Sequence, residues 1–196
     1  MSTTPLITFR MAAESDIVAL AQFADIATRG LMSFVWGQMA HPGQSSLEVG
    51  QNIIRSVEAN TSHFKNWCIG DCEGRPVCAI NSYHLTEAVF NPVDLDVFRP
   101  LNALKARVLG AWYISNVAVY AEYRGNRFGT ALLTEAENAA RSARICRLAL
   151  TVGSFNRNAY DLYRKYGFSE YARQPLLPVP GTDDTGEWVL MIKDLS

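Results

Sequence analysis

The sequence predicts a single α/β domain over residues 1–196. Stretches in which apolar residues alternate are interleaved with stretches in which they recur with helical spacing, so strands and helices follow one another along the chain. With 196 residues and 48% hydrophobic composition, the chain suits one sizeable core and leaves little room for a second. We find no internal repeat, low-complexity tract or interdomain linker that would divide it.

The charge balance argues against several classes of partner. Lysine and arginine total 18 against 19 acidic residues, so a net charge of -1 gives no sequence-wide attraction to nucleic acid or an anionic membrane. The start has no export signal, and no stretch approaches the about 20 apolar residues of a membrane span, so we expect a cytoplasmic protein. The cysteines lack zinc-like spacing; we expect no metal, and buried free thiols at Cys68, Cys72, Cys78 and Cys146.

The first elements are a strand and a long helix. Residues 6–12 are expected to form the strand, and residues 14–31 a helix with one apolar stripe, capped by Ser15 or Asp16. The segment 33–44 that follows is expected to be a loop. This order places a loop rich in aromatic residues between two helices.

A capping box and a tight turn mark the next elements. Ser45 and Glu48 have capping-box spacing, and the helix that they open is expected to bury Val49, Ile53, Ile54 and Val57. Residues 67–85 consist of two apolar, β-prone runs around the turn residues Glu73 and Gly74, which predicts a hairpin.

The second half continues the alternation. A connection over 86–111, part of it helical, leads to a strand over 112–120. A helix, a strand over 146–152, a short helix ended by Gly167 and a last strand over 186–195 complete the order βααββ, insert, βαβαβ. A proline-rich loop over 175–186 precedes the last strand.

The segment YRGNRFGTALL, residues 123–133, joins a strand to a helix through glycines. The first turn of a helix has unpaired N–H groups and a positive dipole end, so this arrangement suits an anion, and Arg124 and Arg127 add charge. It has neither GxGxxG nor the Walker lysine, which disfavours dinucleotides and nucleoside triphosphates. Taken alone, the segment is an ordinary turn more often than a ligand site.

Two motifs together carry a family resemblance. VAVYAEYRGNRFGTALL, from Val117, followed by TVGSFNRNAYDLYRKYGF, from Thr151, resembles the GNAT superfamily of acyl-CoA-dependent N-acyltransferases. The family's loop pattern, (Gln or Arg)xxGx(Gly or Ala), is met by Arg124 and Gly129, with Arg127 in place of the customary middle glycine. The second pattern, NxxAxxLYxxxGF, is matched by Asn156, Ala159, Leu162, Tyr163, Gly167 and Phe168.

The resemblance implies a fold and an activity. The fold is a GNAT-like α/β (α+β) arrangement, a mixed, mostly antiparallel central sheet with splayed central strands, flanked by helices. The activity is N-acetyl transfer from acetyl-CoA to a primary amine of a small molecule or peptide, by direct attack in a ternary complex. A homodimer through the exposed last strand and the proline-rich loop is a further expectation, and a catalytically silent acyl-CoA-binding or regulatory module is the alternative.

Roles in cofactor binding follow from the resemblance. The strand residues Val117, Ala118 and Val119 would meet the pantetheine arm and the acyl carbonyl, Asn156 would bond to the pantetheine, and Tyr163 would face the sulfur. The pyrophosphate would be surrounded by Arg124, Gly125, Asn126, Arg127, Phe128, Gly129 and Thr130. We expect Arg127 to have a helical φ at no cost, with its side chain turned outward or used against a phosphate.

The reaction needs support for a leaving thiolate and a path for the amine proton. Tyr163 suits the first task through a hydrogen bond to sulfur, because complete proton transfer from a phenol is uphill by roughly 2 kcal/mol. Outside the motif, a core tyrosine on a helix face would be the more ordinary role for Tyr163.

The base and the acceptor site are less defined by the sequence. The strand face that carries Ser115 and Tyr113 has neither Glu nor His, so the base is open between Tyr113 with water and four other groups, namely His84, Glu87, Asp94 and Asp96. Aromatic residues expected near the acceptor are Phe34, Trp36, Tyr83, Trp112 and Tyr113.

Overall fold

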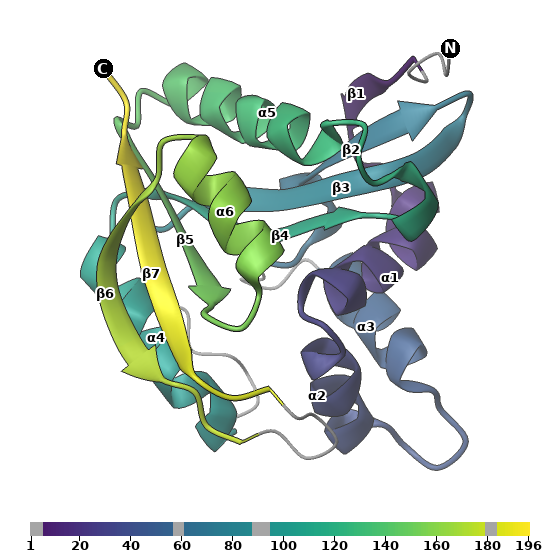
Figure 1. Ribbon diagram of the computed structural model, residues 1–196. Coiled ribbons are helices and arrows are strands. Elements are labelled where there is room, and N and C mark those ends of the chain that lie inside the picture. Colours follow the sequence, from purple (N-terminus) through teal and green to yellow (C-terminus); the bar gives the residue numbers. More distant parts are fainter. Residues whose placement is uncertain (1–5, 57–60, 88–94, 179–183) are drawn as a thin grey trace. The chain divides into compact units, whose positions relative to one another are not determined.

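A seven-stranded sheet in the order β1-β2-β3-β4-β5-β7-β6 forms the framework of the computed structural model (Figure 1). The structure describes residues 6–56, 61–87, 95–178 and 184–196. Strand pairs are antiparallel at both ends of the sheet, whereas β4 (Trp112–Val119) and β5 (Arg147–Gly153) pair in parallel. Six α-helices of the described residues flank the strands, which confirms the predicted mixed, mostly antiparallel α+β fold.

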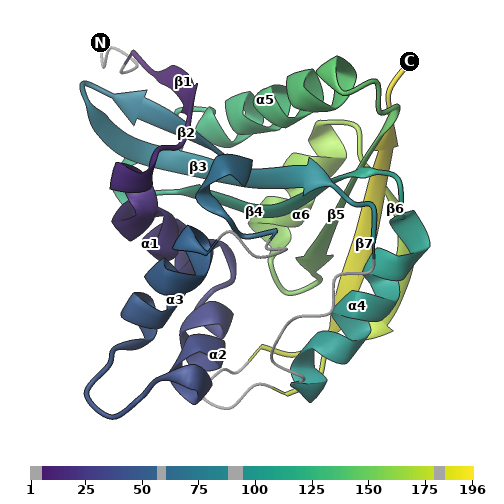
Figure 2. The same ribbon diagram turned by 180° about the vertical axis from the view of Figure 1, so that it is seen from behind.

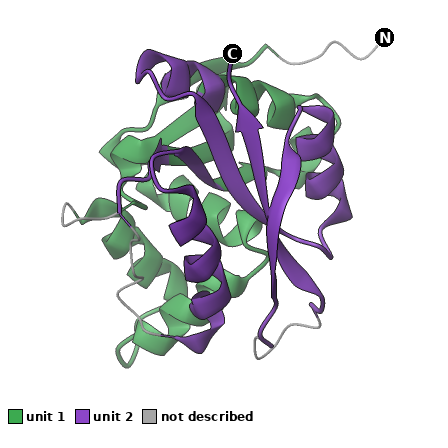
Figure 3. Cartoon of the chain, turned by 90° about the vertical axis from the view of Figure 1, so that its left-hand side faces the viewer, with its two compact units in different colours: residues 1–82, 116–135 green, residues 83–115, 136–196 purple. Residues whose placement is uncertain are grey.

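The chain divides into two compact units, coloured separately in Figure 3. The first unit comprises residues 1–82 and 116–135, and the second comprises residues 83–115 and 136–196. The chain therefore passes from one unit to the other within β3, β4 and the helix that follows β4. A single domain over 1–196 stays a prediction.

The first unit contains an antiparallel three-stranded arrangement. Strand β1 (Thr8–Met11) pairs with β2 (Trp67–Cys72), which pairs in turn with β3 (Arg75–His84). Glu73 and Gly74 between β2 and β3 have φ of 52° and 79°, the two positive values that a tight hairpin turn requires. The predicted hairpin is therefore confirmed.

Three helices follow β1 where the sequence predicted two. They are α1 (Ile17–Ala27), α2 (Leu31–Met39) and α3 (Ser46–Arg55). The expected loop over 33–44 is wrong, because most of it belongs to α2. Gly30, with φ of 90°, ends the first helical run, and the new helix buries Leu31, Val35 and Trp36. Burial of these large side chains outweighs the modest helix propensity of β-branched and aromatic residues.

Helix α3 begins as predicted. Ser45 Oγ accepts a bond from the Glu48 amide at 3.3 Å, and a Glu48 carboxylate oxygen accepts one from the Ser45 amide at 2.7 Å. Of the expected buried residues, Val49 and Ile54 are buried and Ile53 is partly buried, whereas Val57 lies outside the described residues. Trp36 covers Gly50 so closely that a Cβ there would come within 2.6 Å of the indole, so α2 and α3 meet at a position that requires glycine.

The second unit is built around β7 (Glu187–Asp194), which pairs antiparallel with β5 on one side and with β6 (Ser169–Pro175) on the other. The sequence prediction missed β6, whose side chains are mostly exposed and give no clear apolar alternation. The expectation of an exposed last strand is also wrong, because β7 is an interior strand that buries Val189, Leu190 and Met191.

Helices cover the strands of the second unit. Helix α4 (Arg99–Lys105), the helical part of the predicted insert, packs against β6 and β7 (Figure 2), and α6 (Arg157–Lys165) packs against β5. Gly167, with φ of 102°, ends α6 as predicted, and the Phe168 amide bonds back to the Tyr163 carbonyl at 3.0 Å.

One carboxylate ties the last half of α5 (Phe128–Ser142) into the second unit. Glu137 accepts bonds from Lys193 at 2.7 Å, from Arg141 at 2.8 Å and from the Tyr166 hydroxyl at 3.2 Å. Lys193, together with the other donors, holds the pKa of Glu137 below its ordinary value. The Glu137 carboxylate therefore has a structural role, with three hydrogen-bond donors as partners.

The cysteines differ in exposure. All four are free; Cys72 and Cys78 are buried and Cys68 is partly buried, but Cys146 is exposed, contrary to the prediction of four buried thiols. Burial raises the pKa of Cys68 to about 11 and that of Cys78 to about 12, so both remain protonated thiols at neutral pH.

No single helix of the described residues has the length and apolar character to cross a membrane; the sharply bent pair Glu14–Ala27 and Leu31–Met39 meets those criteria only when taken together.

The start of α1 depends on Asp16. This carboxylate is 7% exposed. It accepts hydrogen bonds from both terminal nitrogens of Arg10, at 2.7 and 2.9 Å, and from the Ala13 amide at 2.8 Å. Asp16 occupies the cap position that the sequence predicted, but its side chain turns back to Ala13 instead of capping the helix that follows. The bond from Arg10 is the main cause of a pKa of Asp16 below its ordinary value of 3.8.

We expect Asp16→Asn to lower the free energy of unfolding by about 1–3 kcal/mol at pH 7, because Arg10 loses its charged partner. A carboxylate with a lowered pKa contributes stability above its unfolded pKa and loses it as the pH falls through the folded pKa. The difference between wild type and variant should therefore shrink below about pH 4. Urea denaturation at pH 7 and pH 3 measures it.

Glu14→Gln is the matched control, since Glu14 forms an exposed ion pair with Arg55 at 3.3 Å. It should change stability by less than about 0.5 kcal/mol. Equal losses in Asp16→Asn and Glu14→Gln would contradict the role given to Asp16.

Candidate active site

The loop between β4 and α5 is held in place before the helix begins. The Tyr120 amide bonds to the Val77 carbonyl at 3.0 Å, and the Arg124 amide bonds to the Ala121 carbonyl at 3.2 Å. The Asn126 side chain donates to the Tyr123 carbonyl at 3.0 Å. These bonds fix the path of the chain into α5.

The amides that follow are left unpaired. Within the part of the chain that the structure describes, the backbone N–H groups of residues 125–130 donate no hydrogen bond. The helical hydrogen bonds of α5 begin with the Ala131 amide, which donates to the Arg127 carbonyl at 3.1 Å. Phe128 is buried and anchors the first turn of α5. The loop thus presents several free N–H groups at the positive end of a 15-residue helix, an arrangement that suits an anion.

The end of β4 leads directly into this loop. Ala118 is buried in the core of the first unit, whereas Val117 and Val119 are partly exposed. The Val119 carbonyl accepts a bond from Arg124 Nε at 3.3 Å, which ties the strand end to the loop. Arg124 and Arg127 are both exposed, and Thr130 is exposed on the first turn of α5.

Asn156 in the second unit has a structural task. It is the N-cap of α6, where its side-chain oxygen accepts the Ala159 amide at 3.4 Å. Its side-chain NH₂ group has no partner among the described residues and is free to donate to a ligand. The sequence motif indicated a ligand contact at Asn156 and missed this capping bond, although an asparagine directly before a helical run is also the signature of a cap.

Tyr163 lies on the buried face of α6. It is 8% exposed, its ring packs edge-on against Phe168 with centroids 6.0 Å apart, and its hydroxyl has no partner among the described residues. Burial, followed by the neighbouring Tyr113, raises the pKa of Tyr163 above its ordinary value of 10.0. The phenol therefore remains protonated throughout the physiological range and acts as a hydrogen-bond donor.

Tyr113 belongs to a cluster on β3, β4, β5 and α4. Its hydroxyl donates to Thr151 Oγ1 at 2.9 Å, its ring centroid lies 6.0 Å from that of Tyr83, and Lys105 Nζ lies 5.1 Å from it. Burial raises the pKa of Tyr113, with Lys105 acting in the opposite direction. A protonated phenol that already donates to Thr151 is poorly suited to accept a proton, which weighs against Tyr113 as the base.

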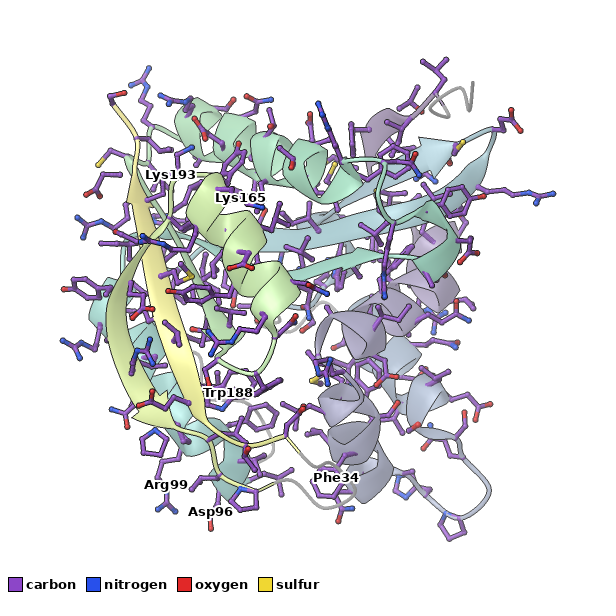
Figure 4. The ribbon with its side chains drawn as sticks, viewed as in Figure 1. Phe34, Asp96, Arg99, Lys165, Trp188 and Lys193 are labelled. Carbon is purple, nitrogen blue, oxygen red and sulfur yellow. The ribbon has the colours of Figure 1, made fainter. Side chains whose placement is uncertain are left out.

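The other predicted base candidates are not enclosed. His84 and Glu87 are exposed, and Asp96 is exposed and forms an ion pair with Arg99, beside which it is drawn in Figure 4. Asp94 lies outside the described residues. None of these three described groups has the buried setting in which a protein usually tunes a catalytic base.

The aromatic residues expected near the acceptor differ in availability. Phe34 on α2, labelled in Figure 4, is partly exposed, but Trp36 is 2% exposed and belongs to the core of the first unit. In the second unit, Tyr83 is buried and Trp112 is partly buried. The sequence analysis did not single out Lys105, which lies beside Tyr83 and Tyr113. The signal in the sequence is weak, namely a lysine next to the buried Leu104 at the end of a short helix.

Comparison with protein-family models shows which family the chain belongs to. Residues 48–168 match the model of the acetyltransferase (GNAT) family, a span of more than half of the chain. The chain belongs to the GNAT family of acetyltransferases. It is thus an acyltransferase of a class that depends on acetyl-CoA and acts on an amine acceptor.

Solved structures share the GNAT fold at low identity. An N-acetyltransferase from Staphylococcus aureus Mu50 is 19% identical with a TM-score of 0.63, covering 95% of this chain and 100% of that one. A ribosomal-protein-alanine N-acetyltransferase from Brucella melitensis is 19% identical with a TM-score of 0.62, covering 96% and 99%. PaiA N-acetyltransferase from Thermoplasma acidophilum, solved with coenzyme A, is 14% identical with a TM-score of 0.55, covering 96% and 99%. No protein of curated function matches the sequence.

The GNAT loop has an unusual backbone at Arg127. Its φ is +61°, in the left-handed region, so the expectation of a helical φ at no cost is wrong. An L-residue with a side chain pays about 1–2 kcal/mol there, whereas glycine does not. This explains in physical terms why a glycine suits this position, and it shows that the arginine keeps the glycine-like conformation.

We expect Arg127→Gly to raise the free energy of unfolding by about 1 kcal/mol, because it removes this strain while adding some freedom to the unfolded chain. Arg127→Ala, the matched control, removes the same side chain but keeps a Cβ at positive φ, so it should give no such gain. Thermal denaturation of both variants measures the difference. An equal gain in both would place the effect in the side chain rather than the backbone.

Proposed function

We propose that the protein transfers an acetyl group from acetyl-CoA to a primary amine by direct attack within a ternary complex. The observation that carries this proposal is the run of unpaired amides over residues 125–130 at the start of α5, inside a segment that matches the GNAT family. The residues fit a pyrophosphate, since they supply free N–H donors, a helix N-terminus and two exposed arginines. The relative from Thermoplasma acidophilum was itself crystallised with coenzyme A.

The other cofactor contacts are proposed from the motif and the free groups. Val117, Ala118 and Val119 offer backbone groups to the pantetheine arm, and Asn156 offers its side-chain NH₂. Residues Arg124 to Thr130 surround the pyrophosphate. When bound, acetyl-CoA supplies the activated thioester.

Tyr163 is proposed to stabilise the leaving sulfur. Its hydroxyl is protonated, has no partner among the described residues and lies on a buried helix face, so it can donate a hydrogen bond to developing negative charge. The raised pKa of Tyr163 makes a hydrogen bond the preferred role over full proton donation. We propose that the amine proton leaves to water.

The acceptor is proposed to be a small molecule or a peptide with a primary amine. The similar structures include a ribosomal-protein-alanine N-acetyltransferase and a putative phosphinothricin N-acetyltransferase, whose names imply different acceptors, so this level of similarity names no single amine. Phe34, Trp36, Tyr83 and Tyr113 remain the proposed acceptor-side residues. A homodimer and a cytoplasmic location stay predictions.

Cofactor binding is tested by titration of coenzyme A and acetyl-CoA into the purified protein. Gly129→Leu should weaken binding by more than about tenfold, because a branched side chain in the first turn of α5 blocks access to the amides. Arg127→Gly should change affinity by less than about threefold. Equal effects of the two variants, or failure of the folded wild type to bind millimolar cofactor, would contradict the cradle.

Turnover is tested by thiol release across a panel of amines. Tyr163→Phe should lower kcat by about 10–100-fold, the loss expected for one hydrogen bond to a charged atom. Tyr163 is active in its protonated form, and its pKa is raised above 10.0. Loss of the Tyr163 proton should therefore cause no fall in the wild-type rate between pH 7 and about pH 10, and the pH profiles of wild type and variant should have the same shape over this range.

Tyr160→Phe on the same helix is the matched control, because Tyr160 bonds to Glu170 outside the proposed site. It should retain the wild-type kcat. Turnover that falls only in Tyr163→Phe excludes the silent acyl-CoA-binding module, whereas CoA binding without turnover of any amine would favour it.

A further inference from the structure

Lys105, the last residue of α4, is a cation without a carboxylate partner. It is partly buried, and its Nζ lies 5.1 Å from the centroid of the Tyr113 ring. In the described ranges no acidic side chain pairs with it, whereas Lys193 is paired with Glu137 at 2.7 Å. An ammonium that leaves water without a counter-ion costs free energy, so the position calls for an explanation.

Tyr83 on β3 provides a second unsatisfied group. The residue is 6% exposed, and its buried hydroxyl meets no acceptor among the described residues, although it lies near enough to Lys105 to raise the pKa of that ammonium through a hydrogen bond. The neighbouring Tyr113 hydroxyl, in contrast, is satisfied by Thr151 at 2.9 Å. A buried hydroxyl without a partner costs about 1–3 kcal/mol, which native proteins rarely tolerate without a use for it.

Lys105 and Tyr83 belong to one cluster. Both stand beside the Tyr113 ring, and the surrounding side chains are apolar, among them Leu104, Val108, Ala149 and Leu190. Burial alone would lower the pKa of Lys105, but the electrostatic effect of Tyr83 and Tyr113 and a hydrogen bond to Tyr83 more than offset this and raise it. Lys105 therefore stays charged at neutral pH and cannot act as a base; it attracts an anion.

The cluster is near the proposed chemistry within the same unit. Tyr113, which contacts Lys105, also lies close enough to Tyr163 to contribute to its raised pKa. An anion held by Lys105 would thus be part of the acceptor molecule, whose amine reacts near Tyr163. One positive charge and one hydroxyl match the single charge and two oxygens of a carboxylate, whereas a phosphate dianion needs more donors.

We propose that Lys105 and Tyr83 bind a carboxylate of the acceptor, so that the substrate is an amine of the amino-acid class. This inference rests on the proposed acetyl transfer. Lys105 supplies the charge, the Tyr83 hydroxyl supplies a directed donor, and the apolar walls around them exclude water. The acid group then orients the amine, and neither residue takes part in the proton transfer.

The test compares amines that differ only in the acid group. Acetylation of phenylalanine and leucine is measured against phenethylamine and 3-methylbutylamine, with 2-aminoethylphosphonate as a phosphonate probe. The wild type should favour each amino acid over its decarboxylated partner by at least about tenfold in kcat/KM. Lys105→Met should abolish that preference by lowering kcat/KM for the amino acids toward that for their decarboxylated partners, and Tyr83→Phe should reduce it.

Lys65→Met, which removes an exposed lysine of the first unit, is the matched control and should leave the preference unchanged. An unchanged preference in Lys105→Met, or a wild type that treats both members of a pair equally, overturns the inference while acetyl transfer stands. Preference for the phosphonate over both amino acids overturns the carboxylate assignment.

Binding without turnover separates this site from the proposed function. N-Acetylphenylalanine should raise the Tm of the wild type, N-acetylphenethylamine should not, and Lys105→Met should show no shift with either. If no amine is acetylated, acetyl transfer fails but these shifts still decide the carboxylate site. The ligand-free Lys105→Met should melt at or above the wild-type temperature, because methionine replaces an ammonium that has no carboxylate partner. A lower Tm would indicate a structural role and overturn the proposal.

Discussion

The parallel pairing of β4 and β5 is the constraint on which the candidate site depends. Trp112–Ile114 pair with Leu148–Leu150 in the same direction, so the chain must return from the end of one strand to the start of the other. Parallel neighbours need such a crossover, and α5 provides it. The N-terminus of α5 and its unpaired amides therefore follow the end of β4 after a short loop. A hairpin at this point would have left no helix end to hold an anion.

Polar groups in the structure fall into two kinds. Asp16 and Glu137 each accept several hydrogen bonds and join separate segments of the chain, so these hydrogen bonds stabilise the fold. The amides after Arg124 and the Tyr83 hydroxyl lack acceptors among the described residues, and the Lys105 ammonium has no carboxylate partner there. Polar groups without partners destabilise the ligand-free fold, and they become favourable when a ligand forms hydrogen bonds or ion pairs with them. This is the common trade-off between stability and function.

The elements that the sequence predicted well are those with a local signal. The Ser45–Glu48 capping box, the Glu73–Gly74 turn and the Gly167 helix end each depend on a few neighbouring residues. Helix α2 and strand β6 were missed because tertiary packing decides the first and because the second, mostly exposed, has no apolar alternation. The motifs singled out the loop and Tyr163 as candidates, but the sequence pattern predicts neither the positive φ of Arg127 nor the neighbours of Lys105.

The edge strand β6 has a consequence for association between copies of the chain. Arg173 on this strand pairs with Glu170 at 2.8 Å and with Glu187 of β7 at 2.6 Å, so the border of the sheet is lined by charged side chains. Docking a foreign strand there would strip water from these ions before any new backbone bond could form. Charged edge strands of this kind disfavour edge-to-edge aggregation, so the unpaired edge of β6 is protected against pairing with a strand of another molecule.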